Sequence, residues 1–315
     1  MESAALSVVI PTYRRAHLLP EVVAPLLADP AVREVVVVDD GSDDPTPEVC
    51  LTLSRSDPRV TVVRQENAGE AAARAAGAET ASSELLLFLD DDVVATPTTA
   101  TGHLCRHSAD EPLRVVLGYM PPRQAVPREP GQFPLVIYGT DYEKACARYE
   151  ADPGSVLRDL WGGNFSLRRT VFLEASAHTA VPRELPYHQD QVLGWQLRSF
   201  GCTGIFDRAL GAEHRYERSP DQFFVDCRRR GEALAGLRAI APDDVEIDPR
   251  AYSGPAVRQA SRILSLRPDV ARQVLRWATT SAGRVHWWPM ETRVAKLLRN
   301  AESYAAFTGA VADHP

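Results

Sequence analysis

Short apolar runs, often of β-branched residues, alternate with segments of helical periodicity through the first 120 residues. The runs at 6–10 (LSVVI) and 35–38 (VVVV) are typical of buried strands in a parallel sheet. Leucines and valines recur at helical spacing over 18–27, which predicts a right-handed strand–helix–strand unit. Further strands are predicted at 59–63, 84–89 and 113–118, and helices near 70–81 and 98–109. This alternation predicts an α/β fold with a doubly wound, mostly parallel sheet.

The pattern changes after this alternating part. A proline-rich stretch over 121–134 and a glycine-containing region over 160–215 predict loops and short strands that close over a site. From about residue 222 the periodicity predicts helices, near 222–240, 255–280 and 290–308. The expected organisation is a domain over 1–220, with halves 1–120 and 121–220, and a helical C-terminal region over 221–315.

Composition and charge exclude several classes of protein. The chain has 315 residues, 44% of them hydrophobic, and this is enough for a substantial core. A net charge of −7 argues against a nucleic-acid partner. The five cysteines form no Cys-x-x-Cys pair, and no apolar run approaches the roughly 20 residues that span a bilayer. We expect a cytoplasmic protein with reduced thiols.

Three adjacent acids, Asp90, Asp91 and Asp92, directly follow the predicted strand at 84–89. They lie at the carboxyl end of a buried strand, where open α/β sheets bind their ligands. Adjacent carboxylates resist desolvation unless a cation or hydrogen-bond donors compensate them. Oxygen ligands select Mg²⁺ or Mn²⁺, and such an ion keeps positions for the oxygens of a diphosphate. The alternative is a solvated acidic turn.

A second acidic pair, Asp39 and Asp40, follows the strand at 35–38 in the same relation to the sheet. Two strand ends that carry carboxylates suggest one shared crevice. The alternative is structural, because Asp-Gly-Ser after a strand also makes a good turn and helix cap.

Six motifs occur in a fixed order: VVIPTYRR, VVVVDDGSDD, ENAGEAAARAAG, LLLFLDDDV, GGNFSLRR and QDQVLGWQL. In order and spacing they resemble the inverting family 2 glycosyltransferases of the GT-A fold, over about residues 6–215. The resemblance implies transfer of a sugar from a nucleotide-sugar, with UDP as the expected nucleotide, to an acceptor hydroxyl with the help of Mn²⁺ or Mg²⁺. The Arg- and Ala-rich composition suggests a bacterial source, and the acceptor is not identified.

The resemblance also implies roles on the donor side. Asp92 matches the metal-binding acid of the DxD signature, and His214 could complete the metal shell. The residues expected to contact the donor are Pro11, Tyr13, Asp40, Arg74, Asp90 and Asp91.

On the acceptor side, Asp190 matches the aspartate that acts as general base. A carboxylate in reach of the attacking hydroxyl can take its proton. Gln189 stands where the family usually has glutamate, so the second carboxylate of the family's motif is absent here. The residues expected to contact the acceptor are Gly163, Asn164, Gln189 and Trp195. Without the resemblance, Asp190 would be an acid that stabilises a helix N-terminus.

The C-terminal region concentrates positive charge. Residues 250–299 contain ten Arg or Lys and two acids, together with Trp277, Trp287 and Trp288. Such helices could lie on the inner face of an anionic membrane. The favoured alternative is a helical lid with its tryptophans packed on the catalytic domain and its arginines in water. The arginines could also bind an anionic acceptor or a partner chain, including a second copy of this one.

Two other functions stay open. A nucleotidyltransferase would share the sheet and the acidic metal ligands, but PTYRRAHLL lacks the glycine-rich loop typical of that class. A non-catalytic nucleotide-sugar-binding subunit is the other, because of Gln189.

Overall fold

The computed structural model describes residues 5–124, 126–178, 187–238, 240–245, 247, 255–264 and 266–313. Part of the predicted acceptor half, 179–186, and the start of the basic stretch, 250–254, lie outside these residues. The described residues form two compact units. The first falls within 1–123, 143–183 and 189–215, and the second within 124–142, 184–188 and 216–315. The boundary expected at residue 220 stays a prediction.

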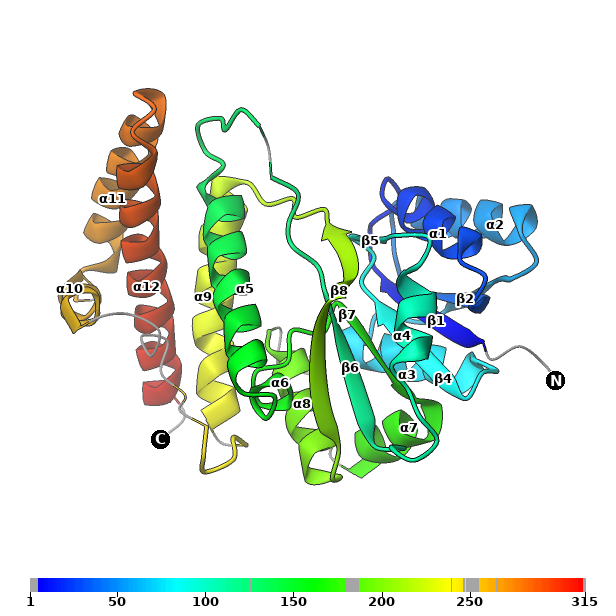
Figure 1. The fold of residues 1–315 in the computed structure, drawn as a ribbon. Helices are drawn as coiled ribbons and strands as arrows, with labels where there is room; N and C mark the ends of the chain where they lie inside the picture. Colours follow the sequence, from blue (N-terminus) through cyan, green and yellow to red (C-terminus); the bar gives the residue numbers. More distant parts are fainter. Residues whose placement is uncertain are drawn as a thin grey trace. The chain divides into compact units, whose positions relative to one another are not determined.

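The first unit is built on one sheet (Figure 1). Its described strands are β1 (Leu6–Thr12), β2 (Val32–Asp39), β3 (Val60–Arg64), β4 (Leu85–Leu89), β5 (Val93–Ala95), β6 (Arg114–Tyr119), β7 (Asn164–Arg168) and β8 (Thr203–His214). Their order is β3-β2-β1-β4-β7-β6-β8-β5. Strands β1 to β4 are parallel, β6 is parallel to β8, and β7 and β5 run against their neighbours. The predicted doubly wound, mostly parallel sheet is confirmed.

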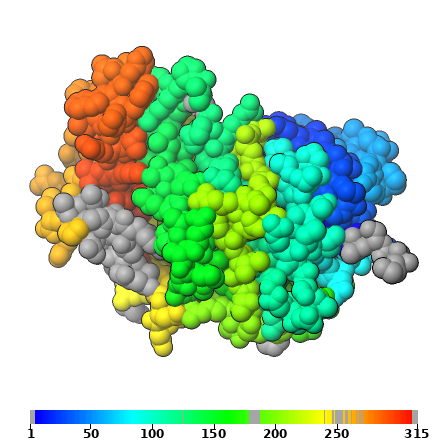
Figure 2. Space-filling view, in the orientation of Figure 1, coloured from blue at the N-terminus to red at the C-terminus, as the bar shows by residue number. Residues whose placement is uncertain are grey.

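Helices cover both faces of this sheet. They are α1 (Leu19–Ala28), α2 (Thr46–Ser56), α3 (Glu70–Thr80), α4 (Thr99–Cys105), α6 (Ser155–Arg158), α7 (Arg169–His178) and α8 (Gln189–Ser199). One core cluster joins strand residues such as Val9, Val36 and Phe88 to side chains of α3, α6, α7 and α8. Alternate strand side chains point to the opposite face, where α1 lies. The surfaces of α4 and β8, far apart in sequence, lie side by side (Figure 2).

One element departs from the expected pattern, and another agrees with it. Helix α5 (Phe133–Ala151) begins inside the stretch expected to be irregular, and the division between the two units falls within it. Strand β7 occupies part of the region expected to form loops and short strands, and it pairs with both β4 and β6.

The second unit is helical. Its helices are α9 (Pro220–Arg238), α10 (Pro255–Leu264), α11 (Pro268–Arg284) and α12 (Trp288–Asp313), with the first part of α5. Phe133 and Ile137 pack with residues of α9 and α12. The segment expected at 255–280 is two helices, and α11 begins at Pro268 because proline suits the first turn of a helix. Among the described residues no helix has the length and apolarity to cross a membrane.

Two arginines of this unit are arranged differently from the predicted lid. Trp277 and Trp287 are exposed. Arg272 and Arg299 instead form ion pairs with acids of the same unit, Glu302 and Asp141. The expectation of solvated arginines is therefore wrong for Arg272 and Arg299, and the packing of the tryptophans on the catalytic domain stays a prediction.

Candidate active site at the carboxyl ends of the strands

The predicted donor residues lie at one edge of the sheet because β1, β2 and β4 run in the same direction. Thr12 is opposite Asp39 in the β1–β2 register, so Tyr13 and Asp40 follow neighbouring strand ends. Pro11 is buried within β1, and Tyr13 is exposed. The amide of Tyr13 donates a hydrogen bond to Asp91 Oδ2 at 3.3 Å, which links the end of β1 to the acid triplet.

Asp40 holds the loop that leads into α3. Its Oδ1 accepts hydrogen bonds from Gln65 Nε2 at 2.8 Å and from the Ala68 amide at 2.9 Å. Its Oδ2 accepts one from the Gly69 amide at 2.9 Å, and Gly69 adopts a φ of 88°, which favours glycine. The carboxylate thus has a structural role at the crevice, and its predicted contact with the nucleobase stays a prediction.

Arg74 is the central cation of the site. Its side chain is only 2% exposed, and it lies on α3 facing the ends of the strands. Nη1 donates to Asp190 Oδ1 at 2.5 Å, and Nη2 donates to Asp90 Oδ1 at 3.1 Å and pairs with Glu70. Burial lowers the pKa of Arg74, but these carboxylates outweigh burial and raise its pKa above the ordinary value. Arg74 therefore stays charged and ties three acids together.

The acid triplet divides between two arginines. Asp90 faces Arg74, whereas Arg15 contacts both other acids, with Nε 3.6 Å from Asp91 Oδ1 and Nη2 3.1 Å from Asp92 Oδ2. Burial raises the pKa of Asp90 to about 6, and Arg74 acts against this rise. Burial, followed by repulsion from Asp92, raises the pKa of Asp91 to about 7. The triplet is thus a partly buried acidic cluster and not a freely solvated turn.

His214 lies at the end of β8, where it pairs with Val93 of β5. Its Nε2 is 3.2 Å from Asp92 Oδ1. Within the described residues no group of three or more His, Cys, Asp or Glu side chains is placed to hold a metal ion. The pair nevertheless fits a divalent ion, because a carboxylate and an imidazole suit Mn²⁺ and an ion with few protein ligands keeps positions for phosphate oxygens.

The start of α8 brings Asp190 to Gly162. Asp190 Oδ2 accepts a hydrogen bond from the Gly162 amide at 3.0 Å, and a Cβ at Gly162 would lie 2.8 Å from Asp190 Oδ1. Gln189 Oε1 accepts one from the Ala71 amide at 3.1 Å, in the first turn of α3. The Gly163 carbonyl accepts the Asp90 amide at 3.1 Å. Residues from both predicted halves therefore meet within one unit.

Two residues predicted to contact the acceptor are buried and bonded elsewhere. Asn164 Nδ2 donates to the Leu210 carbonyl at 3.1 Å, and its Oδ1 is 3.0 Å from His103 Nε2. Trp195 Nε1 donates to the Arg158 carbonyl at 3.0 Å. These hydrogen bonds hold both side chains in the frame of the site, and their predicted contact with the acceptor stays a prediction.

Two residues of the site were not singled out from the sequence, Arg15 and Glu70. Arg15 is part of PTYRR, and its position after β1 at the same edge as the triplet was an available signal. Glu70 stands four residues before Arg74 on one helix, a spacing that favours an ion pair. Burial raises the pKa of Glu70, although its side chain is 42% exposed.

An open, mostly parallel sheet with acids at the ends of β2 and β4 and a covering acid on α8 is an arrangement of the GT-A fold. The sequence model of Glycosyl transferase family 2 matches residues 7–174, more than half of the chain, and the chain belongs to this family.

Curated relatives match a shorter part of the chain. Validoxylamine A glucosyltransferase of Streptomyces hygroscopicus subsp. jinggangensis is 43% identical over 118 residues, which are 36% of this chain and 28% of that protein. Glycosyltransferase GlyG of Streptococcus pneumoniae is 39% identical over 95 residues, which are 29% of this chain and 32% of that protein. The matched segments thus span about a third or less of these relatives.

Solved structures share the fold over almost the whole chain. A mannosyltransferase from Pyrobaculum calidifontis, in complex with GDP-Man and Mn²⁺, has a TM-score of 0.63 at 19% identity and covers 98% of this chain and 88% of its own. Residues 1–349 of TarS from S. aureus, in complex with UDP, have a TM-score of 0.50 at 16% identity, with 98% and 92% covered. At these identities the likeness shows the fold alone.

Proposed function

We propose that this glycosyltransferase transfers a sugar from a nucleoside-diphosphate sugar to an acceptor hydroxyl with inversion, and that Asp190 is the general base. The observation that carries the proposal is the bridge made by Arg74. Its guanidinium lies 3.1 Å from Asp90, an acid of the expected donor side, and 2.5 Å from Asp190. One buried cation therefore fixes the distance between the donor acid and the base.

The donor would bind along residues 1–120, with the nucleobase near Pro11, Tyr13 and Asp40. Asp92 and His214 would hold Mn²⁺ or Mg²⁺, with Asp90 and Asp91 beside the sugar and the ribose. When bound, the ion supplies Lewis-acid stabilisation of the departing diphosphate. The charge of Arg74 and Arg15 keeps the carboxylates oriented while the donor enters.

The acceptor would approach from the Gly162–Gly163 turn, within the predicted half 121–220. As the acceptor oxygen bonds to the anomeric carbon, the bond from that carbon to the diphosphate oxygen breaks and the hydroxyl proton passes to Asp190. Each carboxylate oxygen has two lone pairs, so Asp190 can accept this proton while Arg74 and the Gly162 amide remain bound to it. A single displacement of this kind inverts the anomeric centre.

The identity of the donor nucleotide can be tested by ligand binding alone. The fold neighbours were solved with GDP-Man and with UDP, and we take a UDP-sugar as the first candidate and a GDP-sugar as the second. A thermal-shift panel of both nucleotide classes, with and without Mn²⁺, identifies the donor because a ligand that binds only the native state raises the midpoint.

Asp190→Asn tests the base. We expect turnover, measured as nucleoside diphosphate released from the donor, to fall about 10²- to 10⁴-fold while donor binding is kept. Asn can still accept the Gly162 amide hydrogen bond. The matched control is Asp110→Asn, an exposed acid outside the site, which should leave turnover unchanged. Turnover of Asp190→Asn at the level of the control would rule out this base.

One observation favours a second candidate function. Gln189 stands in place of the family's usual glutamate and accepts the Ala71 amide hydrogen bond, as expected of a non-catalytic nucleotide-sugar-binding subunit. Donor binding without any turnover by the unaltered protein would identify that function. Release of pyrophosphate from a nucleoside triphosphate in the presence of a sugar phosphate would identify a nucleotidyltransferase.

A further inference from the structure

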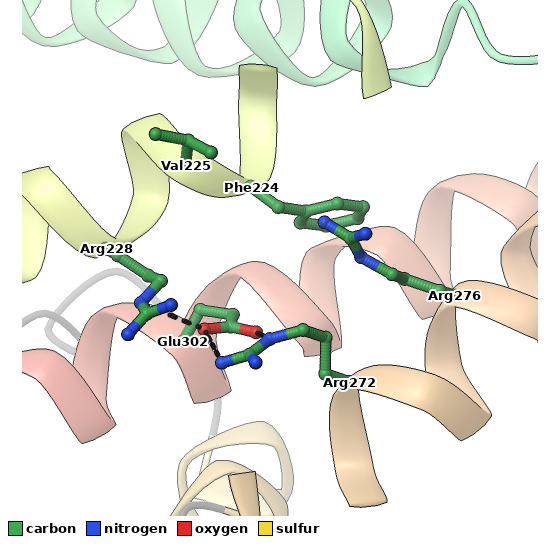
Figure 3. A pocket seen from close by; sticks show the side chains of 6 residues that line it. All are labelled: Phe224, Val225, Arg228, Arg272, Arg276 and Glu302. Carbon is green, nitrogen blue, oxygen red and sulfur yellow. Dashed lines mark hydrogen bonds and ion pairs between the residues drawn. The ribbon is translucent and has the colours of Figure 1, made fainter. Parts of the chain in front are cut away.

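The second unit contains a cavity of about 260 Å³ between α9, α11 and α12 (Figure 3). Six side chains line it: Phe224, Val225, Arg228, Arg272, Arg276 and Glu302. Three arginines from two helices converge on a pocket with one acid and an apolar wall. None of these residues belongs to the candidate active site at the carboxyl ends of the strands, which we call the strand-end site.

One arginine is neutralised within the pocket. Arg272 Nε donates to Glu302 Oε1 at 2.5 Å, and its Nη2 donates to Oε2 at 3.1 Å, which is a bidentate pair. Glu302 is only 3% exposed, so this pair accounts for its buried charge. The exposed Asp269 also pairs with Arg272 Nη1 at 3.1 Å, so the guanidinium groups without a buried acid of their own are those of Arg228 and Arg276.

Those two groups are weakly compensated. Arg228 Nε lies 3.8 Å from Glu302 Oε2, beyond hydrogen-bonding distance. Arg276 pairs through Nη1 with Asp221 at 3.1 Å, but Asp221 is exposed, and Arg276 lies over the ring of Phe224 at 5.2 Å. Its Nε is buried without a hydrogen-bond partner among the described residues. A buried unmet donor is costly unless a ligand satisfies it.

The orientation of α11 strengthens this interpretation. Arg272 and Arg276 face the pocket, whereas Val270, Val274 and Trp277, on the other face of the helix, are exposed, Trp277 by 72%. Burial of apolar surface alone would favour the opposite rotation of the helix. The arrangement keeps the two guanidinium groups on the pocket at the expense of apolar burial.

We propose that this pocket binds a phosphate group. Of the side chains that line the pocket, three are cationic and one is anionic, and the two further acids that pair with these arginines, Asp221 and Asp269, are exposed. Guanidinium forks suit the oxygens of phosphate, and the Phe224 ring holds the fork of Arg276 in place. The phosphate belongs either to a soluble phosphate ester or to a lipid headgroup.

The experiment titrates the 315-residue protein with inorganic phosphate and with glycerol 3-phosphate, by calorimetry at fixed ionic strength. Arg276→Gln and Arg228→Gln should each weaken binding about tenfold, since each removes charge-assisted hydrogen bonds. The matched control is Arg284→Gln, an exposed arginine of the same helix, which should bind like the parent. Glu302→Gln, if folded by circular dichroism, should bind phosphate more tightly because it removes the opposing charge.

Sedimentation with phosphatidylcholine vesicles, with and without phosphatidic acid, separates the two sources. Cosedimentation that needs phosphatidic acid and Arg276 assigns the phosphate to a lipid; calorimetric binding without cosedimentation assigns it to a soluble ester. Two results would overturn the proposal: equal affinity in Arg276→Gln, Arg228→Gln and Arg284→Gln, or no binding of any of these probes. Phosphate binding at the strand-end site would persist in all three variants and is thereby distinguished.

Discussion

Replacing Arg74 by methionine tests the electrostatic organisation of the strand-end site. Arg74→Met keeps the volume but removes the buried cation shared by Asp90, Asp190 and Glu70. Removing one partner of a buried ion pair costs about 3–5 kcal/mol. All three acids retain some exposure, Glu70 the most at 42%, and they can rehydrate or take up protons. We therefore expect a loss near the lower end, about 3 kcal/mol.

The loss should depend on pH. Arg74 lowers the pKa of both Asp90 and Glu70, so its removal moves these pKa values further up. A raised folded-state pKa contributes stability at low pH that is lost as the pH rises through it. Arg74→Met should therefore unfold about 6–12 °C lower than the parent near pH 8 and differ less near pH 5, by circular dichroism in EDTA.

Arg74→Lys separates charge from geometry. It keeps the positive charge but not the two-armed contact, so its midpoint should lie between those of Arg74→Met and the parent. Equal midpoints of Arg74→Met and the parent near pH 8, or an equal loss at both pH values, would refute the reasoning.

Two further predictions concern the same edge of the sheet. A Cβ at Gly163 would lie 2.6 Å from Asp90 Oδ2 and 2.7 Å from Met120 Sδ, so Gly163→Ala should displace Asp90 and lower kcat/KM about tenfold. In Gly211→Ala the new Cβ meets no described atom within 4 Å, and unchanged kinetics are expected; equal kinetics of both variants would contradict the prediction. Because burial raises the pKa of Asp91 to about 7, its ionisation costs stability as the pH rises from its unfolded value through about 7. Asp91→Asn should be more stable than the parent by about 2 kcal/mol near pH 8 in EDTA, with little difference near pH 4, and a pH-independent difference in melting temperature would count against this.

Most of the sheet was predictable because parallel strands buried on both faces are continuous apolar runs. The predicted strands at 6–10, 35–38 and 84–89 correspond to β1, β2 and β4 within a few residues. Strand β7 does not have this signature. Its Asn164 and Ser166 are fully buried, which polar residues tolerate only with partners, and His103, distant in sequence, bonds to both. Such a partnership is visible only in three dimensions.

Helix α5 was hidden by its composition. It begins after a proline-rich stretch, carries Pro134 in its first turn and contains Gly139 and several β-branched or aromatic residues of modest helix propensity. Phe133 and Ile137 in one unit and Tyr149 in the other are nevertheless buried. Tertiary packing of these side chains overrides local propensity, and a single sequence does not reveal it.

The acidic residues of the strand-end site could be predicted from the sequence. The hydrogen-bond partners of its buried side chains could not. Three adjacent acids after a buried strand repel one another and resist desolvation, which does not help the chain to fold. Their presence therefore indicates a binding site. Asn164 and Trp195 lie in motifs associated with the acceptor, yet their side chains point into the frame. A motif gives the position of a residue along the chain but not the partner of its side chain.

The charges of the site constrain how a nucleotide-sugar could bind there. Five acids converge on two arginines: Glu70, Asp90, Asp91, Asp92 and Asp190 on Arg15 and Arg74. A diphosphate adds negative charge to an edge that already has an excess of it, so the two repel unless a cation stands between them. Arg74 is committed to Asp90 and Asp190, and Arg15 to Asp91 and Asp92, so neither is available without releasing an acid. A divalent ion at Asp92 and His214 would supply the missing charge, and the metal dependence that we propose therefore follows from charge balance as well as from the DxD signature.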